Sequence, residues 1–128
     1  VWGDGSPIRD FIYSTDVARG MMMAVEKNIN EPINLGSGTG VSIKQIAETV
    51  AKNAPGGSIP IEWDTSKPAG DARRLMDMTR AQSYGFETIV EIEEGIIKTM
   101  DWYLDKRDEA DKRYNAFTED VSTRTRLK

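Results

Sequence analysis

The sequence contains neither cysteine nor histidine, and these two absences remove several kinds of chemistry. Without cysteine there can be no disulfide and no thiolate site for zinc. Without histidine the chain lacks the usual proton carrier near neutral pH and the commonest metal ligand. Carboxylates, lysine and tyrosine are the remaining candidates for proton transfer, and none stands beside an obvious activating partner. We therefore expect no catalytic residue and no metal site within the chain itself.

Long apolar runs and an excess of basic residues are missing too. The longest apolar run, residues 21–25, is far too short to cross a bilayer, and we expect no secretory signal before it. The formal net charge of -4 offers no positive field for a polyanion, so we do not expect a nucleic acid partner. We expect no membrane contact and a cytoplasmic setting, the default for a chain without disulfides.

The residues that are present indicate one small α/β domain of short strands and amphipathic helices. A chain of 128 residues, 38% of them hydrophobic, has a common size for a single domain. The clearest element is a helix over 42–53, because Ser42 and Gln45 have the spacing of a capping box. A further helix is expected to extend to about Asn28, with Asp16 as its N-cap. A short helix that Thr79 caps is expected to end at Gly85, and a last helix is expected over 92–106.

Four short segments alternate with these helices and are expected to be extended. One of them presents Arg9, Phe11 and Tyr13 on a single face. Another, residues 59–63, contains Pro60 and is therefore expected at the edge of a sheet, where a proline is tolerated. The other two are residues 33–35 and 74–78. The helix residues expected to face the core are Val17, Met21, Ala24 and Val25 in the first helix and Ile92, Ile96, Met100, Tyr103 and Leu104 in the last.

A glycine-rich loop at residues 36–40 leads into the helix over 42–53. Such a loop can present backbone N–H groups that hold a phosphate, as dinucleotide-binding folds do. However, Val41 stands where the full fingerprint requires glycine, and the nearest downstream acids lie too far along the chain. A tight connection between a strand and a helix is the interpretation that we favour for this loop.

The stretch over residues 2–13 carries the first candidates for ligand binding. Two glycines and a proline form a turn before the strand that contains Arg9. The planar guanidinium of Arg9 can bind a diphosphate through two parallel hydrogen bonds, or it can form a structural salt bridge with a nearby acid. Trp2 can stack on a flat base, or it can belong to the core or to an interface.

Three further cations lie between residues 67 and 74. Lys67 can reach a phosphate or remain exposed on its loop. Arg73 and Arg74 are adjacent, so an extended backbone directs them to opposite faces and only one of them can point to a ligand. We favour Arg74 as the one that does. Asp77 and Thr79 are expected to cap a short helix rather than to bind a ligand.

Together these motifs resemble the extended short-chain dehydrogenase/reductases that act on nucleotide sugars, and in particular the GDP-fucose synthases. They occur in the order that this family has, and they cover roughly residues 1–105. A match over several blocks is more specific than any one block would be. The blocks are residues 2–13 with 16–18, then 33–38, 42–47, 64–68 with 73–77, 84–86 and 93–96.

The resemblance implies that the chain is the C-terminal, substrate-binding part of such an enzyme, without the N-terminal Rossmann half. That half would hold NAD(P) and the catalytic Tyr-x-x-x-Lys pair. The resemblance also implies that Trp2 and Arg9 contact a nucleoside diphosphate sugar and that the loop over 67–70, with Lys67, closes over it. Arg74 would face the same ligand. Ala69 departs from the family, which often has an acid at that position.

We therefore expect residues 1–107 to form the substrate-binding part and residues 108–128 to form a charged tail, as frayed helix or disordered chain. Alone, the chain should bind no cofactor and carry out no redox reaction. The surface left by the missing half should be apolar, which predicts self-association into a homo-oligomer. The alternative is a stand-alone module that binds a nucleotide sugar, or mediates an interaction, without redox activity.

Overall fold

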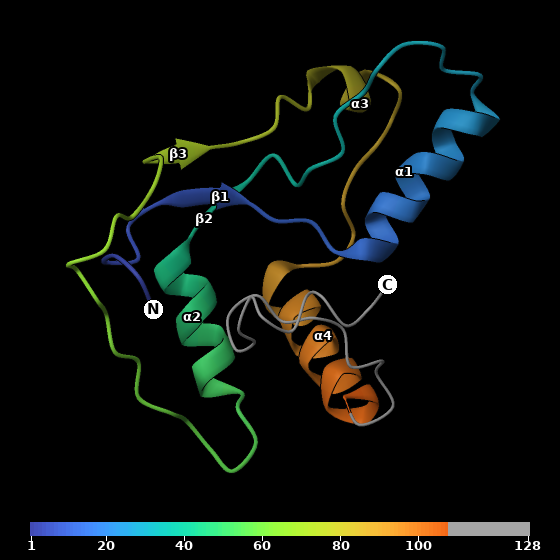
Figure 1. The fold of residues 1–128 in the computed structure, drawn as a ribbon. Helices are drawn as coiled ribbons and strands as arrows, with labels where there is room; N and C mark the ends of the chain where they lie inside the picture. Colours follow the sequence, from blue (N-terminus) through green and yellow to red (C-terminus); the bar gives the residue numbers. More distant parts are fainter. Residues whose placement is uncertain (108–128) are drawn as a thin grey trace, which may run out of the picture.

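The structure, a computed structural model, describes residues 1–107, so the predicted tail over 108–128 lies outside the described residues. It confirms a small α/β fold (Figure 1). In chain order the elements are β1 (Ile8–Asp10), α1 (Ser14–Glu26), β2 (Gly40–Ser42), α2 (Ile43–Lys52), β3 (Arg73–Arg74), α3 (Thr79–Ser83) and α4 (Ile92–Lys106).

The three strands form one sheet in the order β2-β1-β3, with β1 in the middle. β1 is antiparallel to β2 and parallel to β3. Its residue Arg9 is paired with Val41 on one side and with Arg74 on the other. Because paired residues in neighbouring strands face the same side of a sheet, the two arginines share one face. β1 ends earlier than predicted, and residues 11–13 connect it to α1 without strand pairing.

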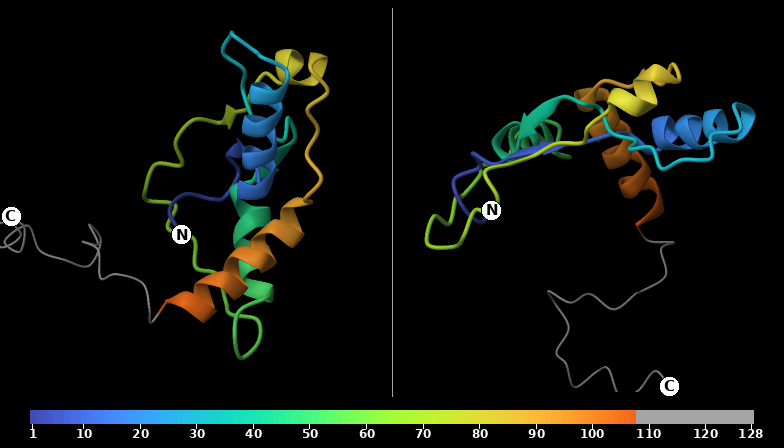
Figure 2. Two further views of the ribbon diagram at one scale, coloured as in Figure 1. Left: turned by 90° about the vertical axis from the view of Figure 1, so that its right-hand side faces the viewer. Right: turned by 90° about the horizontal axis from the view of Figure 1, so that it is seen from above.

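α2 and α4 are neighbours, and α1 stands apart from α2 at one end of the molecule when it is seen from above (Figure 2). An ion pair of 3.6 Å between Lys52 and Glu93 joins α2 to α4. Between α4 and the segment that enters α1, Gly95 packs against the ring of Tyr13. These contacts hold α2, α4 and the segment before α1 together, whereas most residues of α1 are exposed to solvent.

The buried core is small and lies near α3. Met78, Ala81 and Phe86 are buried together. The partly buried residues packed around them are Ile12, Met23, Ile33 and Leu35. The apolar face predicted for the first helix is therefore wrong: Met21 is 61% and Val25 is 73% exposed. In α1 the buried positions are Asp16 and Gly20, because the core lies on the other side of the helix. Tyr103 and Leu104 of α4 are also exposed, contrary to prediction.

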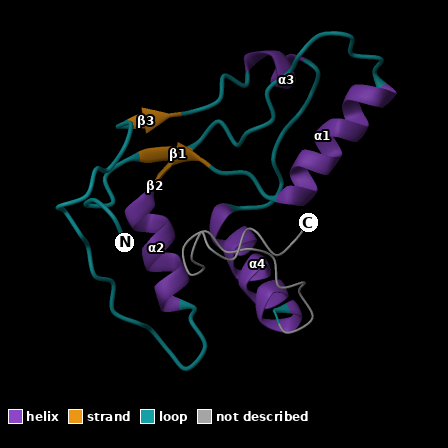
Figure 3. Ribbon diagram, viewed as in Figure 1, coloured by secondary structure: helices purple, strands orange, loops and turns teal. Residues whose placement is uncertain are grey.

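Two of the predicted strands are loops (Figure 3). In residues 33–35, burial of Ile33 and Leu35 against the core takes the place of strand pairing. The amide of Asn34, between them, donates to the carbonyl of Asp77 at 3.1 Å. Residues 59–63 likewise form no strand, and only an isolated bridge between Trp2 and Asp64 follows them. The connection from α2 to β3 is thus one long loop.

The helix ends test the predicted caps. Ser42 caps α2 as predicted: its Oγ accepts from the N–H of Gln45 at 3.1 Å, and the Gln45 side chain accepts from the N–H of Ser42 at 3.0 Å. α4 has the predicted bounds. Asp16 is not an N-cap, because α1 begins at Ser14, after Tyr13.

The short helix α3 begins at Thr79 rather than after it, so the prediction that Thr79 caps this helix is wrong. Its N–H donates to Oδ1 of Asp77 at 3.0 Å. Hydrogen bonds from Thr79 hold the pKa of Asp77 below its usual value. The N-cap of α3 is Met78, without a side-chain cap hydrogen bond, so Asp77 is not the cap that we expected, and its carboxylate instead accepts from the N–H of the first helical residue. Gly85, with a φ of 86°, ends this segment as predicted.

Candidate functional site

Arg9 and Arg74 meet at Asp71. Nη1 of Arg9 donates to the carbonyl oxygen of Asp71 and to that of Ile8, both at 2.8 Å. Nη2 of Arg74 donates to Oδ2 of Asp71 at 2.6 Å. The main-chain carbonyl of Asp71 thus binds the guanidinium of Arg9, and its carboxylate binds that of Arg74. Arg9 is half-buried, whereas the Arg74 side chain is 75% exposed. The result is a pair of cations on one face of the sheet, with one acid between them.

Arg73 points away from this pair. Its register partner in β1 is Ile8, whose side chain leaves the sheet on the face opposite to Arg9. Arg73 and Arg74 therefore lie on opposite faces, as their adjacency predicted. The pairing places Arg74, the one we favoured, on the same side as Arg9.

Trp2 lies beside Asp64, at the start of the loop that leads to Asp71. The N–H of Gly3 donates to the carbonyl of Asp64 at 2.9 Å, and the N–H of Asp64 donates to the carbonyl of Val1 at 2.8 Å. These bonds fix the backbone around Trp2, but its indole is 66% exposed. The described chain does not bury Trp2 in a core, so stacking on a ligand and contact at an interface remain its two possible roles.

The loop over residues 64–71 connects the turn next to Trp2 with Arg9. Gly3 has a φ of 79°, and a Cβ added to it would lie 3.0 Å from Cα of Ala69, so this close approach requires glycine. On the next residue, Gly70, an added Cβ would lie 3.5 Å from Nη2 of Arg9. The loop therefore touches the N-terminal turn at one position and the arginine pair at the next.

Lys67 lies within this loop. Its N–H closes a turn on the carbonyl of Asp64 at 3.2 Å. The side chain is exposed, and within residues 1–107 its ammonium forms no ion pair. Lys67 is thus an exposed cation on the loop that runs along the chain from Asp64, which is bonded to the turn at Trp2, to Asp71, which binds the arginine pair. The structure brings Arg9 and Arg74 together and links both to Trp2 and Lys67 through one loop.

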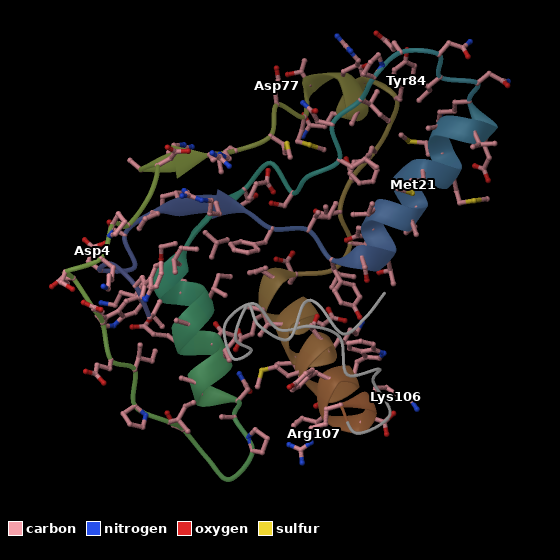
Figure 4. All side chains as sticks on the ribbon, in the orientation of Figure 1. Asp4, Met21, Asp77, Tyr84, Lys106 and Arg107 are labelled. Carbon is pink, nitrogen blue, oxygen red and sulfur yellow. The ribbon has the colours of Figure 1, made fainter. Side chains whose placement is uncertain are left out.

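The turn over residues 3–6 is stabilised by Asp4, which lies where this turn and the long loop meet (Figure 4). Its Oδ1 accepts from the N–H of Ser6 at 2.9 Å and from the Ser6 hydroxyl at 2.7 Å. These two hydrogen bonds hold the pKa of Asp4 below its usual value. Asp4 therefore stays ionised at neutral pH and shapes the turn that precedes Arg9.

Asp10 is an important residue that sequence reasoning did not single out. Its Oδ1 accepts from the N–H and the hydroxyl of Ser37, both at 2.7 Å. Its Oδ2 accepts from the N–H of Gly38 at 3.1 Å and of Met76 at 3.2 Å. Partial burial alone would raise the pKa of Asp10, but these hydrogen bonds outweigh it and leave the pKa below its usual value. Asp10 ties the glycine-rich loop and the segment after β3 to β1.

These bonds also distinguish between the two interpretations of the glycine-rich loop. The amides of Ser37 and Gly38 donate to a carboxylate of the chain itself, so they are not directed at a phosphate. The favoured interpretation, a tight connection between a strand and a helix, is also wrong in its elements, because residues 33–35 form no strand and the loop leads into β2, which α2 follows. The sequence did contain a signal for Asp10. Neighbouring residues in a strand face opposite sides of the sheet, so Asp10, which follows Arg9, was expected to face away from the arginine and not to pair with it.

A second buried acid, Asp16, is completely inaccessible to solvent. Its Oδ2 accepts from the N–H groups of Ile89 and Val90, both at 3.1 Å, and its Oδ1 accepts from Nη1 of Arg19 at 2.8 Å. Burial alone would raise the pKa of Asp16, but these donors outweigh it and lower the pKa. Asp16 anchors the chain that enters α4, which is a structural role.

An apolar cavity of about 250 Å³ lies between α2, α4 and residues 11–13. No lysine or arginine lines it, and Glu91 is its one carboxylate, so it does not suit an anion. Among residues 1–107, no group of three or more acidic side chains could hold a metal ion. In that same part of the chain, no helix is long and apolar enough to cross a membrane.

Comparison with known proteins identifies relatives of the chain. The model of the NAD dependent epimerase/dehydratase family matches residues 1–36. A probable GDP-L-fucose synthase 1 of Oryza sativa subsp. japonica is 39% identical over 106 residues, which are 82% of this chain and 32% of the relative. The GDP-L-fucose synthase of Escherichia coli (strain K12) is 31% identical over 118 residues, which are 84% of this chain and 36% of the relative.

Solved structures of related enzymes have the same fold. A UDP-glucose 4-epimerase of Thermotoga maritima, solved with UDP-glucose, has a TM-score of 0.71 at 29% identity over 84% of this chain and 35% of that chain. A GDP-mannoheptose C4 reductase of Campylobacter jejuni, solved with NADP, has a TM-score of 0.66 at 32% identity over 81% of this chain and 34% of that chain.

The chain spans about a third of the length of the curated relatives that it matches. The matched third is the C-terminal part of the related structures. The order of the sequence motifs, the fold and these relatives agree with one another. The chain is therefore similar to the C-terminal part of the extended short-chain dehydrogenase/reductases, and its first 36 residues match the model of the NAD dependent epimerase/dehydratase family.

Proposed function

We propose that residues 1–107 form the substrate-binding part of an NAD(P)-dependent nucleotide-sugar epimerase or reductase, similar to GDP-fucose synthase. The ligand of this part is a nucleoside diphosphate sugar. The observation that carries the proposal is the pairing of Arg9 with Arg74 on one sheet face, next to a loop that also contacts the turn at Trp2. The related proteins named above are synthases, epimerases and reductases of nucleotide sugars.

The residues of this site suit the parts of such a ligand. Two guanidinium groups can bind the diphosphate, and each charge-assisted hydrogen bond contributes about 1.5–3 kcal/mol when it is shielded from water. Trp2 has an exposed indole that can stack on the base. Lys67 supplies a third positive charge from the loop that lies between them. We assign these four residues to substrate binding and none of them to catalysis.

The glycine-rich loop at 36–40 does not suit the phosphates of the family's cofactor. The glycine-rich loop at 36–40 has its Ser37 and Gly38 amides bound to Asp10. We therefore place NAD(P) binding and redox chemistry in an N-terminal Rossmann half of the polypeptide. The exposed apolar residues Met21 and Val25 on α1 support a surface for that half or for another copy. We expect such an enzyme to work in the cytoplasm.

Titration calorimetry with GDP-, UDP- and dTDP-sugars tests the proposal. One of these ligands should bind, and Arg9→Ala should weaken its binding by about tenfold or more, because 1.4 kcal/mol corresponds to a factor of ten. Arg74→Ala should weaken it less, since this side chain is more exposed. The control is Lys52→Ala, which removes a cation from the far ion pair with Glu93. Absence of binding by every sugar nucleotide would refute the proposal.

A further inference from the structure

Asp71 occupies a fixed position between the two arginines. Its carbonyl oxygen accepts from Arg9 at 2.8 Å, and the carbonyl of the next residue, Ala72, accepts from the N–H of Ile8 at 2.9 Å. Its carboxylate contacts Arg74 at 2.6 Å and is 62% exposed. Two backbone contacts thus hold the residue in place, and its charge projects into solvent beside Arg74.

The charge of Asp71 bears on which anion the pair prefers. Arg9 and Arg74 carry two positive charges, and Asp71 reduces their sum to one. A diphosphate whose outer phosphate is esterified to a sugar carries two negative charges. A free nucleoside diphosphate carries a third at neutral pH, because a terminal phosphate loses its second proton near pH 6.

We propose that Asp71 is a specificity-determining residue that makes this site discriminate against the free nucleoside diphosphate and in favour of its sugar ester. The inference rests on the proposed function, since it concerns the same arginine pair. Asp71 repels the additional charge of the free diphosphate. Two like charges about 6 Å apart in water change an equilibrium by about threefold, which sets the size of the effect.

The test compares the affinities of one nucleotide sugar and of the nucleoside diphosphate with the same base, measured by calorimetry at pH 7.5. The readout is the ratio of the two dissociation constants. Asp71→Asn keeps the shape of the residue and the carbonyl that accepts from Arg9, but it removes the charge. This variant should improve binding of the free diphosphate by about threefold relative to the nucleotide sugar. Glu93→Gln, which loses the same charge from an exposed ion pair on α4, should leave the ratio unchanged.

Two further variants separate charge from shape. Asp71→Glu retains the charge and should keep the ratio close to that of the unmodified chain. Asp71→Ser is neutral and should shift the ratio as asparagine does, which keeps the test available if one variant does not fold. A ratio that is unchanged in both neutral variants, while both ligands still bind, would overturn the inference and leave the proposed function standing. Failure of the unmodified chain and of all variants to bind either ligand would overturn both.

Discussion

Replacing Asp10 by asparagine should destabilise the whole arrangement that holds the arginine pair. Asparagine has one side-chain oxygen, which can take the place of Oδ1 and keep the two bonds of 2.7 Å from Ser37. The new NH₂ group then takes the place of Oδ2 and faces the N–H groups of Gly38 and Met76, which would be left without an acceptor. The substitution thus loses two hydrogen bonds to a charge and places donors against donors.

The magnitude follows from these two lost bonds. A hydrogen bond to a charged group contributes about 1.5–3 kcal/mol when it is buried. Asp10 is only half-buried, so we take the lower end of that range. We expect the free energy of unfolding to fall by about 3 kcal/mol for the pair of bonds. The loss is large because folded domains are stable by only about 5–15 kcal/mol.

Urea denaturation followed by tryptophan fluorescence measures this change. The control is Asp101→Asn on the exposed side of α4, which should alter the free energy of unfolding by less than about 0.5 kcal/mol. The reasoning would be refuted if Asp10→Asn were no more destabilising than this control. In that case the four contacts to Asp10 would not be what ties the glycine-rich loop to β1.

Three further predictions concern pH, redox chemistry and assembly. Folding lowers the pKa values of Asp10 and Asp16. The stability that these two carboxylates contribute is therefore full above the unfolded pKa of about 3.9 and is lost as the pH falls through their folded pKa values. Denaturation midpoints measured between pH 6 and pH 2 should show this loss of stability, and Asp10→Asn should make the loss smaller. The purified chain should not oxidise NADPH or NADH in the presence of a nucleotide sugar, and absorbance that falls at 340 nm in proportion to protein would contradict our assignment of redox chemistry to another part. Met21→Glu combined with Val25→Glu should shift self-association towards monomer in sedimentation equilibrium with little loss of stability, because both side chains are exposed; a monomeric unmodified chain would count against the predicted homo-oligomer.

Features that depend on neighbouring residues could be predicted from the sequence. The capping box of α2 needs only Ser42 and Gln45, and the bounds of α4 follow from helical spacing within one segment. Gly85 ends its segment because of its own freedom to adopt a positive φ. The family resemblance also held, since it depends on the order of motifs along the chain.

The site and the core depended on contacts between distant residues. β1 pairs with β3 across more than sixty residues, and that register is what puts Arg9 beside Arg74 and Asp71. The two N–H groups that donate to Oδ2 of Asp16 belong to residues 89 and 90, and nothing near Asp16 in the sequence reveals them. The exposed methionines of α1 show the same limit: helical spacing indicates which residues share a face, but only the position of the core decides which face is buried.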